Sequence, residues 1–448
     1  MPALSVGERI PLSMGGSVEV LGSPLGSGGQ GEIYPVMHKG RTCALKWYTS
    51  SKIRSNIGFR ENLRKNVNDG APSPKFVWPL DITETFRDGY GYVMPLLPAD
   101  HEVFSDILRT YKVTKSDPPR KLPVRFSGFT ALANAALQIV ESFLALHRAG
   151  KSYQDLNDGG IAVDTSSGDV LICDCDNIAA DGCNFGIAGK QGYMAPEIVL
   201  GVSRPNVYSD RFSMAIILFK LLFRDDPFCG SKVLGCCNLT DYNYRKYYGE
   251  NPVFIFDPKD RSNRPDETMN ANSIKMWGHY PLYIRDLFIR AFCDGLRDLP
   301  ARPIETDWIS ALSRLRSESF RCRCGMTSFA GDAAEKYGAF VCPRCGSEYP
   351  VLKIGDTRIV LTEGTEIFSF QIDPESEELH EVSARVVENR NSPGLFGFKN
   401  LSGTRWTAVY SDASKTIEPG GGAPLRAGMR IEFGHGVEGK VLRRNDDG

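Results

Sequence analysis

A glycine-rich turn, one lysine and two aspartates occur in an order that could bind and orient a polyphosphate. The turn follows the pattern Gly-x-Gly-x-x-Gly, with its glycines at Gly26, Gly28 and Gly31. Because glycine has no Cβ, the backbone of such a turn can fold closely over phosphate groups. An isolated glycine cluster is more often an ordinary hairpin turn, but Lys46 follows this one and could bring a cation to the phosphates. Asp155 in a loop and Asp174 at the end of an apolar strand could orient an acceptor hydroxyl and hold a metal ion.

The order of these motifs resembles that of protein kinases. The turn is followed by the strand Ala44-Leu45-Lys46, the loop Asp155-Leu156 and the strand that ends at Asp174. Residues 192–197 are similar to the kinase segment that ends in Ala-Pro-Glu, and Arg302 matches the late arginine that pairs with its glutamate. The resemblance covers roughly residues 18–315. It implies an α+β, bilobal protein-kinase fold with an N-lobe at residues 1–97 and a C-lobe at residues 98–318.

The resemblance also implies a role for each site residue. Lys46 would pair with the phosphates of ATP and be held by Glu61, although an exposed surface position is the alternative for this glutamate. Asp155 would orient the substrate hydroxyl, and Asp174 and Asp176 would bind Mg²⁺ or Mn²⁺. The residues expected around the adenine ring are apolar: Ile33, Ala44, Met94 and Leu97. The implied activity is ATP-dependent phosphorylation of Ser or Thr in a protein substrate.

Four positions depart from the kinase pattern. Tyr153-Gln154 stands where His-Arg usually precedes the catalytic aspartate, and residues 177–192 contain no Ser or Thr, so we expect activation without loop Ser/Thr phosphorylation. Gly160 replaces the asparagine that binds a second metal ion; the candidates for a substitute ligand are Asp176, Asn157 and Asp158. Asn157 also replaces the usual catalytic-loop lysine, and we hypothesise that Lys190 reaches Asp155 in its place. A slow kinase and a nucleotide-binding pseudokinase scaffold are both compatible with these residues.

Four of the twelve cysteines form two short pairs that are separated by seventeen residues. The pairs are Cys322-Arg323-Cys324-Gly325 and Cys342-Pro343-Arg344-Cys345-Gly346. Such knuckles aim backbone amides at thiolates, so we expect a closed structural Zn²⁺ site in a zinc ribbon at residues 319–350. Four free thiols are the alternative.

The remaining residues, 351–448, alternate short apolar runs with turn residues and predict an all-β sandwich. Residues 394–402, Trp406 and residues 425–434 form a closing pattern that resembles forkhead-associated domains. The Ser-Arg and Ser-x-x-His residues that bind phosphate in those domains are missing, which favours a docking module over a phosphopeptide adaptor. The run Asp174-Cys175-Asp176-Asn177 and the loop at residues 153–158, together with the triple architecture, resemble bacterial kinases encoded beside a metal-dependent protein phosphatase and a tellurite-resistance-type von Willebrand A protein. That resemblance implies these two proteins as partners.

Several elements must position the site. Apolar spacing predicts one helix over residues 51–64 that crosses the N-terminal sheet, and long helices over 131–147, 211–222, 283–292 and 304–315. The basic residues 314–323 are expected to form a solvated linker.

Composition limits the partners and the location. The formal net charge is −1, and no stretch has 18 uncharged apolar residues in succession. We therefore expect a cytoplasmic protein that binds neither nucleic acid nor a membrane.

Overall fold

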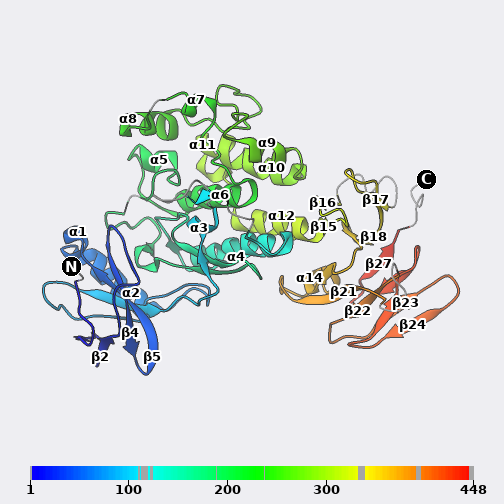
Figure 1. The fold of residues 1–448 in the computed structure, drawn as a ribbon, viewed down its shortest axis with the longest axis horizontal. Helices are drawn as coiled ribbons and strands as arrows, with labels where there is room; N and C mark the ends of the chain where they lie inside the picture. The colour runs from blue at the N-terminus through cyan, green and yellow to red at the C-terminus, as the bar shows by residue number, and fades with distance from the viewer. Residues whose placement is uncertain are drawn as a thin grey trace. The chain divides into compact units, whose positions relative to one another are not determined.

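The computed structural model describes residues 3–108, 111–112, 120–121, 125–187, 189–236, 238–330, 339–389 and 395–442. The chain divides into two compact units. The first comprises Met1–Ser127, Ala135–Lys275 and Asp286–Trp308, and the second comprises Gly128–Asn134, Met276–Arg285 and Ile309–Gly448. Figure 1 shows the course of the chain from the N-terminal strands to the C-terminal sheets.

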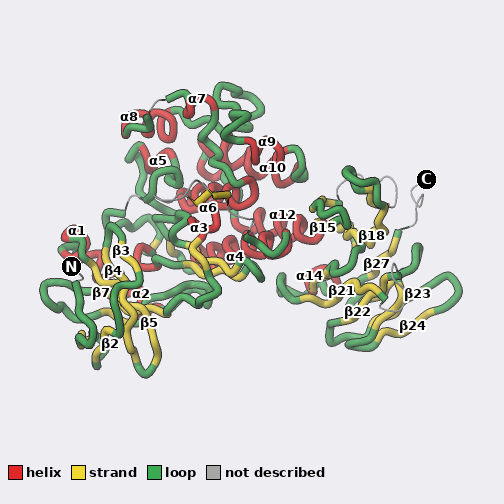
Figure 2. The backbone as a smooth tube through the Cα atoms, in the orientation of Figure 1, coloured by secondary structure: helices red, strands yellow, loops and turns green. Residues whose placement is uncertain are grey.

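The first unit begins with an antiparallel sheet in the order β1-β2-β4-β5-β7-β6, in which β3 also pairs with β4. Its strands are β1 (Arg9–Pro11), β2 (Ser17–Val20), β3 (Gly26–Ser27), β4 (Gly31–His38), β5 (Arg41–Tyr48), β6 (Asp81–Ile82) and β7 (Gly91–Pro95). Side chains alternate along a strand, so Ala44, Lys46 and Tyr48 share one face of β5. On the neighbouring strand β7, Tyr92 is the register partner of Lys46. The strands β4, β5 and β7 lie side by side near α2 in Figure 2.

The helix expected over residues 51–64 is interrupted. The structure has α1 (Ser51–Arg54) and then α2 (Ile57–Asp69). Between them Asn56 is extended, and its side chain accepts a hydrogen bond from the Phe59 amide, as an N-cap does. This cap begins a new helix, which ends at Gly70, where φ is 78°.

The rest of the first unit is mainly helical, and several helices continue into the segments of the second unit. The helices are α3 (Phe104–Leu108), α4 (Phe129–Arg148), α5 (Pro196–Val199), α6 (Val207–Phe223), α7 (Ser231–Leu234), α8 (Asp241–Tyr244), α9 (Ala271–Trp277), α10 (Leu282–Ile289), α11 (Gly295–Arg297) and α12 (Glu305–Glu318). The long helices expected from the sequence are therefore present. Among the described helices, α4 alone is long and apolar enough to cross a membrane, but 56% of its most apolar window is buried inside the protein.

Short strands between these helices carry the loops of the site. They are β8 (Glu102–Val103), β9 (Tyr111–Lys112), β10 (Arg120–Lys121), β11 (Lys151–Ser152), β12 (Ile161–Asp164), β13 (Asp169–Ile172) and β14 (Ala179–Ala180). Strands β12 and β13 form a hairpin. A single turn of 3-10 helix, Cys175–Asn177, follows β13 and Asp174.

The second unit holds two hairpins and a sandwich. One hairpin is β15 (Ser319–Arg321) with β16 (Thr327–Phe329), and the other is β17 (Ala339–Val341) with β18 (Glu348–Ile354). The larger sheet continues from β18 to β19 (Thr357–Val360) on one side and β27 (Glu438–Val441) on the other, then through β26 (Arg430–Glu432) and β23 (Trp406–Val409) to β24 (Ser414–Ile417). The smaller sheet joins β20 (Glu366–Phe368), β21 (Val382–Glu388), β22 (Phe396–Asn400) and β25 (Gly422–Pro424), and α14 (Ser369–Ile372) follows β20.

Both sheets contribute to one apolar core around Trp406, Phe398 and Phe433, which confirms the all-β prediction for the C-terminal region. The expectation of a solvated linker at residues 314–323 is wrong. Arg316 is 3% exposed, donates to Asn134 and to the Leu379 carbonyl, and lies with its guanidinium 3.7 Å from the centre of the Phe368 ring. A charged residue of the expected linker therefore forms part of the interior of the second unit.

Candidate active site

The glycines of the first turn have different structural roles. A Cβ on Gly31 would lie 2.1 Å from the Trp47 carbonyl oxygen, so this glycine is required for the close approach of β4 and β5. A Cβ on Gly26 or Gly28 would meet no atom within 4 Å. The backbone at these two positions is therefore open to a ligand, whereas Gly31 is needed by the sheet itself.

The four residues predicted to surround an adenine ring gather in one apolar cluster. Ala44 and Met94 are register partners on β5 and β7, and both are buried. Ile33 and Leu97 pack at the edge of the same cluster, where Leu171 and Cys173 of the helical part join them. Apolar walls from the sheet and from the helical part are what the flat face of a base requires.

Lys46 lies at the centre of the candidate site and contacts two carboxylates. Its Nζ atom is 3.1 Å from Asp174 Oδ1 and 2.9 Å from Asp176 Oδ2. Burial alone would lower the pKa of Lys46, but the charges of Asp176 and Asp174 more than offset this effect and raise it. The ammonium is therefore a permanent cation that links the sheet to the turn after β13.

The two aspartates have opposite environments. The Asp174 side chain is 44% exposed, and its backbone is left-handed, with φ at 47°. The Asp176 side chain is fully buried and accepts hydrogen bonds from the hydroxyls of Tyr48 and Tyr92 at 2.7 and 3.3 Å. Asp174 thus fits a metal ligand that is open to solvent and phosphate, whereas Asp176, predicted as a second magnesium ligand, has its oxygens engaged inside the protein.

The structure places Glu61 away from this centre. Glu61 is exposed on α2, and the carboxylates that Lys46 contacts are those of Asp174 and Asp176. The predicted pair between Lys46 and Glu61 is therefore not formed, because the face of α2 that turns inward carries Phe59, Leu63 and Asn66.

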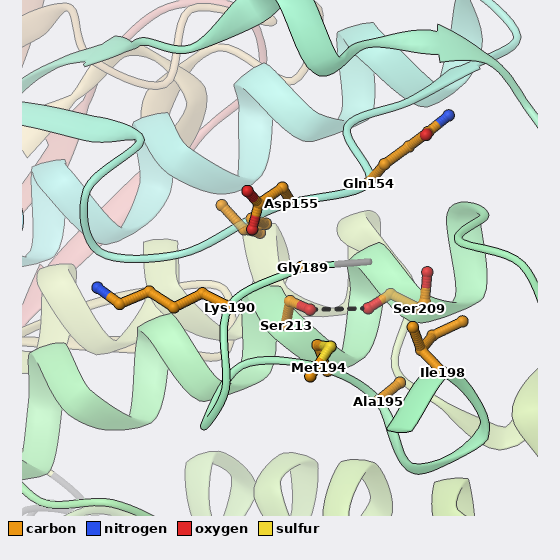
Figure 3. A pocket seen from close by; sticks show the side chains of 10 residues that line it. Gln154, Asp155, Gly189, Lys190, Met194, Ala195, Ile198, Ser209 and Ser213 are labelled. Carbon is orange, nitrogen blue, oxygen red and sulfur yellow. Dashed lines mark hydrogen bonds between the residues drawn. The ribbon is translucent and has the colours of Figure 1, made fainter. Parts of the chain in front are cut away.

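Asp155 lies in the loop after β11, next to a small pocket that Leu156, Gly189 and Met194 help to line (Figure 3). Burial raises the pKa of Asp155, and the charge of Asp174 raises it further, while a hydrogen bond from Asn157 lowers it. Asn157 Nδ2 donates to Asp155 Oδ1 at 3.1 Å. A carboxylate held in this way is oriented and partly desolvated, as a group that accepts a proton needs to be.

Lys190 does not extend its ammonium to Asp155. Its Nζ atom is 2.5 Å from Asp158 Oδ1, and Figure 3 shows the side chain extending away from Asp155. The contact with Asp155 comes instead from the Lys190 backbone amide, which donates to the carboxylate. The hypothesis that the Lys190 side chain supplies the missing cation is therefore not supported, and the salt bridge also occupies Asp158, one of the candidate metal ligands.

The residues that depart from the kinase pattern form connected contacts. The Tyr153 hydroxyl donates to the Cys173 carbonyl at 2.5 Å, and a Cβ on Gly160 would lie 2.4 Å from that hydroxyl. The Gln154 side chain donates to the Cys183 carbonyl and accepts from Asn184 at 2.9 Å. Uncharged hydrogen bonds thus join the loop of Asp155 to the turn after β13 and to the segment beyond it.

Two further contacts stabilise this loop and the segment that ends in Ala-Pro-Glu. Asp210 of α6 accepts from the backbone amides of Tyr153 at 2.6 Å and Gln154 at 3.0 Å. Arg302 forms a bidentate pair with Glu197, at 2.7 and 2.9 Å.

Sequence reasoning missed Tyr48 and Tyr92 as part of the site. The alternation of β5 could have suggested Tyr48, because residues two apart on a strand share a face. Tyr92 depends on the register between β5 and β7, and no local pattern in the sequence gives this register.

The four paired cysteines converge in the second unit. The Sγ atoms of Cys322 and Cys345 are 3.4 Å apart, those of Cys324 and Cys342 are 3.8 Å apart, and all four lie within 4.8 Å of one another. Tetrahedral coordination with Zn–S bonds of about 2.3 Å places sulfurs about 3.8 Å apart, so the cluster is compatible with zinc. Each pair lies at the turn of a hairpin that closes on a glycine with positive φ, Gly325 or Gly346.

Known proteins share the kinase part of this chain. Residues 20–247 match the protein kinase domain family. CBL-interacting protein kinase 4 of Oryza sativa subsp. japonica is 26% identical over 220 residues, which cover 44% of this chain and 46% of that protein. Protein kinase YegI of Escherichia coli (strain K12) is 23% identical over 325 residues, which cover 68% of this chain and 46% of that protein.

The alignments span about half the length of these two relatives. The family match extends over just more than half of the chain and includes the glycine-rich turn, Lys46, Asp155 and Asp174. The chain belongs to the protein kinase family.

Proposed function

We propose that this protein transfers the γ-phosphate of ATP to Ser or Thr hydroxyls of a protein partner. The observation that carries the proposal is the approach of Lys46 Nζ to within 3.1 Å of Asp174 Oδ1, which joins a cation from the sheet to a carboxylate from the helical part. Phosphoryl transfer depends mainly on positioning and charge stabilisation, and these groups can supply both.

Each residue has a defined part in the proposed reaction. Lys46 binds the phosphates, the backbone at Gly26 and Gly28 covers them, and Asp155 orients the acceptor hydroxyl and receives its proton. Asp174 would hold Mg²⁺ or Mn²⁺, and the metal ion would neutralise phosphate charge. Mg²⁺ is usually bound by one or two carboxylates together with phosphates and water, so a single exposed aspartate fits this role.

The proposed activity does not require phosphorylation of the segment after Asp174. In kinases with an arginine before the catalytic aspartate, a loop phosphate pairs with that arginine. Here the uncharged Gln154 side chain forms hydrogen bonds with Cys183 and Asn184, which lie in the segment after Asp174. Protein treated with a phosphatase should therefore keep its transfer rate, and Gln154→Ala should lower it.

Transfer from labelled ATP to generic protein acceptors, with Mg²⁺ or Mn²⁺, tests the function. Asp155→Asn should reduce the rate by about 100-fold or more, because a positioned general base contributes roughly 10²–10⁴-fold. The matched control is Asp241→Asn, which changes an exposed carboxylate on α8 and should leave the rate unchanged. Acid hydrolysis of the labelled acceptor should yield phosphoserine or phosphothreonine. If the wild-type protein binds nucleotide but transfers no phosphate, the proposal is wrong and the protein is a pseudokinase scaffold.

The C-terminal region completes the proposal. Residues 319–350 act as a zinc ribbon with a structural Zn²⁺ on the four cysteines, and residues 351–448 act as a forkhead-associated-like docking sandwich. The partners implied by the resemblance are a metal-dependent protein phosphatase and a von Willebrand A-type protein, in the cytoplasm. Removal of residues 351–448 should abolish binding to these partners in a pull-down, and retained binding would place the contact elsewhere.

A further inference from the structure

Lys46 needs a fixed counter-charge because its ammonium is buried, with a side chain only 7% exposed. A buried ammonium is stable only when it is paired and hydrogen-bonded. Asp174 and Asp176 are both within reach, but Asp174 is the one that is open to solvent. A metal ion would compete with Lys46 for Asp174, and phosphates would compete with Asp174 for Lys46, whereas Asp176 would stay in place.

Asp176 is built into the interior as an acceptor. Its Oδ1 atom accepts from Lys46 at 3.0 Å and from Tyr92 at 3.3 Å, and its Oδ2 atom accepts from Tyr48 at 2.7 Å. Burial and the charge of Asp176 raise the pKa of both tyrosines, so their hydroxyls stay protonated and remain donors. Three donors from β5 and β7 thus surround one carboxylate from the turn after Asp174.

Helix α2 is held by other contacts. Asn62 and Asn66 both donate to the Ile178 carbonyl, at 2.8 and 2.7 Å, and Asn56 donates to the Phe185 carbonyl at 2.8 Å. Lys151, at the start of the Asp155 loop, donates to Asn66 Oδ1 at 2.7 Å. These contacts run from the N-cap of the helix to its last turns, so its position does not depend on a carboxylate that reaches Lys46.

We infer that Asp176, supported by Tyr48 and Tyr92, is the positioning residue that orients Lys46 toward nucleotide, and that no carboxylate of α2 shares this role. The inference rests on the proposed function for the identity of the nucleotide. The inference predicts that Lys46 keeps its orientation toward nucleotide when the charge on the exposed face of α2 is changed.

The test compares Asp176→Asn with Glu61→Gln in the full chain. Calorimetry with a non-hydrolysable ATP analogue and Mg²⁺ measures affinity without any phosphate transfer. Asp176→Asn should weaken binding at least 10-fold, and Glu61→Gln should change it by less than twofold. Tyr48→Phe removes one donor to Asp176 and keeps the ring, so it provides a milder variant with an intermediate loss of affinity.

A second readout follows the lysine itself. An amine-directed reagent, with modification at Lys46 measured by peptide mass spectrometry, should label Asp176→Asn faster than wild type, because the ammonium loses its permanent partner. Unchanged affinity and unchanged labelling in folded Asp176→Asn, or an equal loss of affinity in Glu61→Gln, would overturn the inference. Wild-type protein that shows the expected binding pattern and transfers no phosphate would refute the proposed function alone.

Discussion

The effects of substitutions at Tyr153 and Gly160 on stability should be coupled, because the Tyr153 hydroxyl occupies the space that a side chain at position 160 would need. A Cβ at Gly160 would lie 2.4 Å from the Tyr153 hydroxyl and 3.3 Å from Cζ. Gly160→Ala must therefore displace the hydroxyl and break its bond to the Cys173 carbonyl. Overpacking costs about 1–3 kcal/mol, and the lost hydrogen bond costs about 1 kcal/mol more, since only the Cys175 thiol, 3.6 Å away, then donates to the Cys173 carbonyl.

The double variant reveals the coupling. Tyr153→Phe alone loses the same hydrogen bond, at a cost of about 1 kcal/mol. In the double variant Tyr153→Phe/Gly160→Ala this hydrogen bond is lost only once, and the clash between the new Cβ and the Tyr153 hydroxyl does not arise. The double variant should therefore be more stable than the sum of the two single effects predicts, by about 2 kcal/mol, which is well above the roughly 0.5 kcal/mol scatter of independent sites.

Urea unfolding of the four proteins measures the cycle. Gly159→Ala provides the matched control, since a Cβ there would meet Asn157 and not Tyr153, and its effect should add to that of Tyr153→Phe. Additive free energies of unfolding for Tyr153→Phe and Gly160→Ala would refute the reasoning. They would mean that the glycine replaces the usual asparagine for a reason unrelated to this tyrosine.

Two other predictions concern buried histidine charge and the cysteine cluster. Burial lowers the pKa of His147, but the hydrogen bonds that its ring donates to Asp210 and Glu305 more than offset this and raise it to about 9. The charged imidazole therefore contributes about 3 kcal/mol to the stability of the fold. This contribution is fully present below pH ~6.5 and is lost as the pH rises through about 9. Urea unfolding across this range should show a fall in stability for wild type that is absent in His147→Gln, and identical pH profiles would contradict this. For the cysteine cluster, elemental analysis should find one zinc ion per chain in wild type and in the control Cys183→Ser. Cys322→Ser should contain much less zinc and should unfold at a lower temperature. A full zinc content in Cys322→Ser would exclude the four-sulfur site.

Local patterns were sufficient to find the kinase family and most of its elements. The glycine spacing, the strand that carries Lys46 and the strand that ends at Asp174 are each short segments with their own pattern. The long apolar helices and the alternating C-terminal strands follow from periodicities of 3.6 and 2 residues, and these depend only on neighbours in the chain. Such signals indicated the family match, the mixed helix and sheet architecture, and the all-β C-terminal region.

Local patterns were less informative about partners that lie far apart in the chain. Glu61 has a suitable place on a predicted helix, but the start of α2 at Asn56 and the face that it buries leave this glutamate exposed. Lys190 is near Asp155 through its backbone, and its ammonium pairs with Asp158 instead. In the sequence Arg316 belongs to a run of basic residues that is typical of a linker, but in the structure its side chain is buried in the second unit.

The sequence by itself determined the kinase family and which residues are candidates to bind phosphate, metal and zinc, because residue types and spacing are properties of short segments. Only the tertiary structure decided that Lys46 and two tyrosines enclose Asp176, whereas Asp174 contacts Lys46 from a position that is open to solvent. These aspartates are two positions apart, so sequence distance could not separate their roles. Their difference arises from the fold of the turn after β13. There Asp174 takes a left-handed backbone, and the next residues form a 3-10 turn that carries Asp176 inward, against Lys46 of β5, 130 residues earlier in the chain, and Tyr92 of β7, 84 residues earlier.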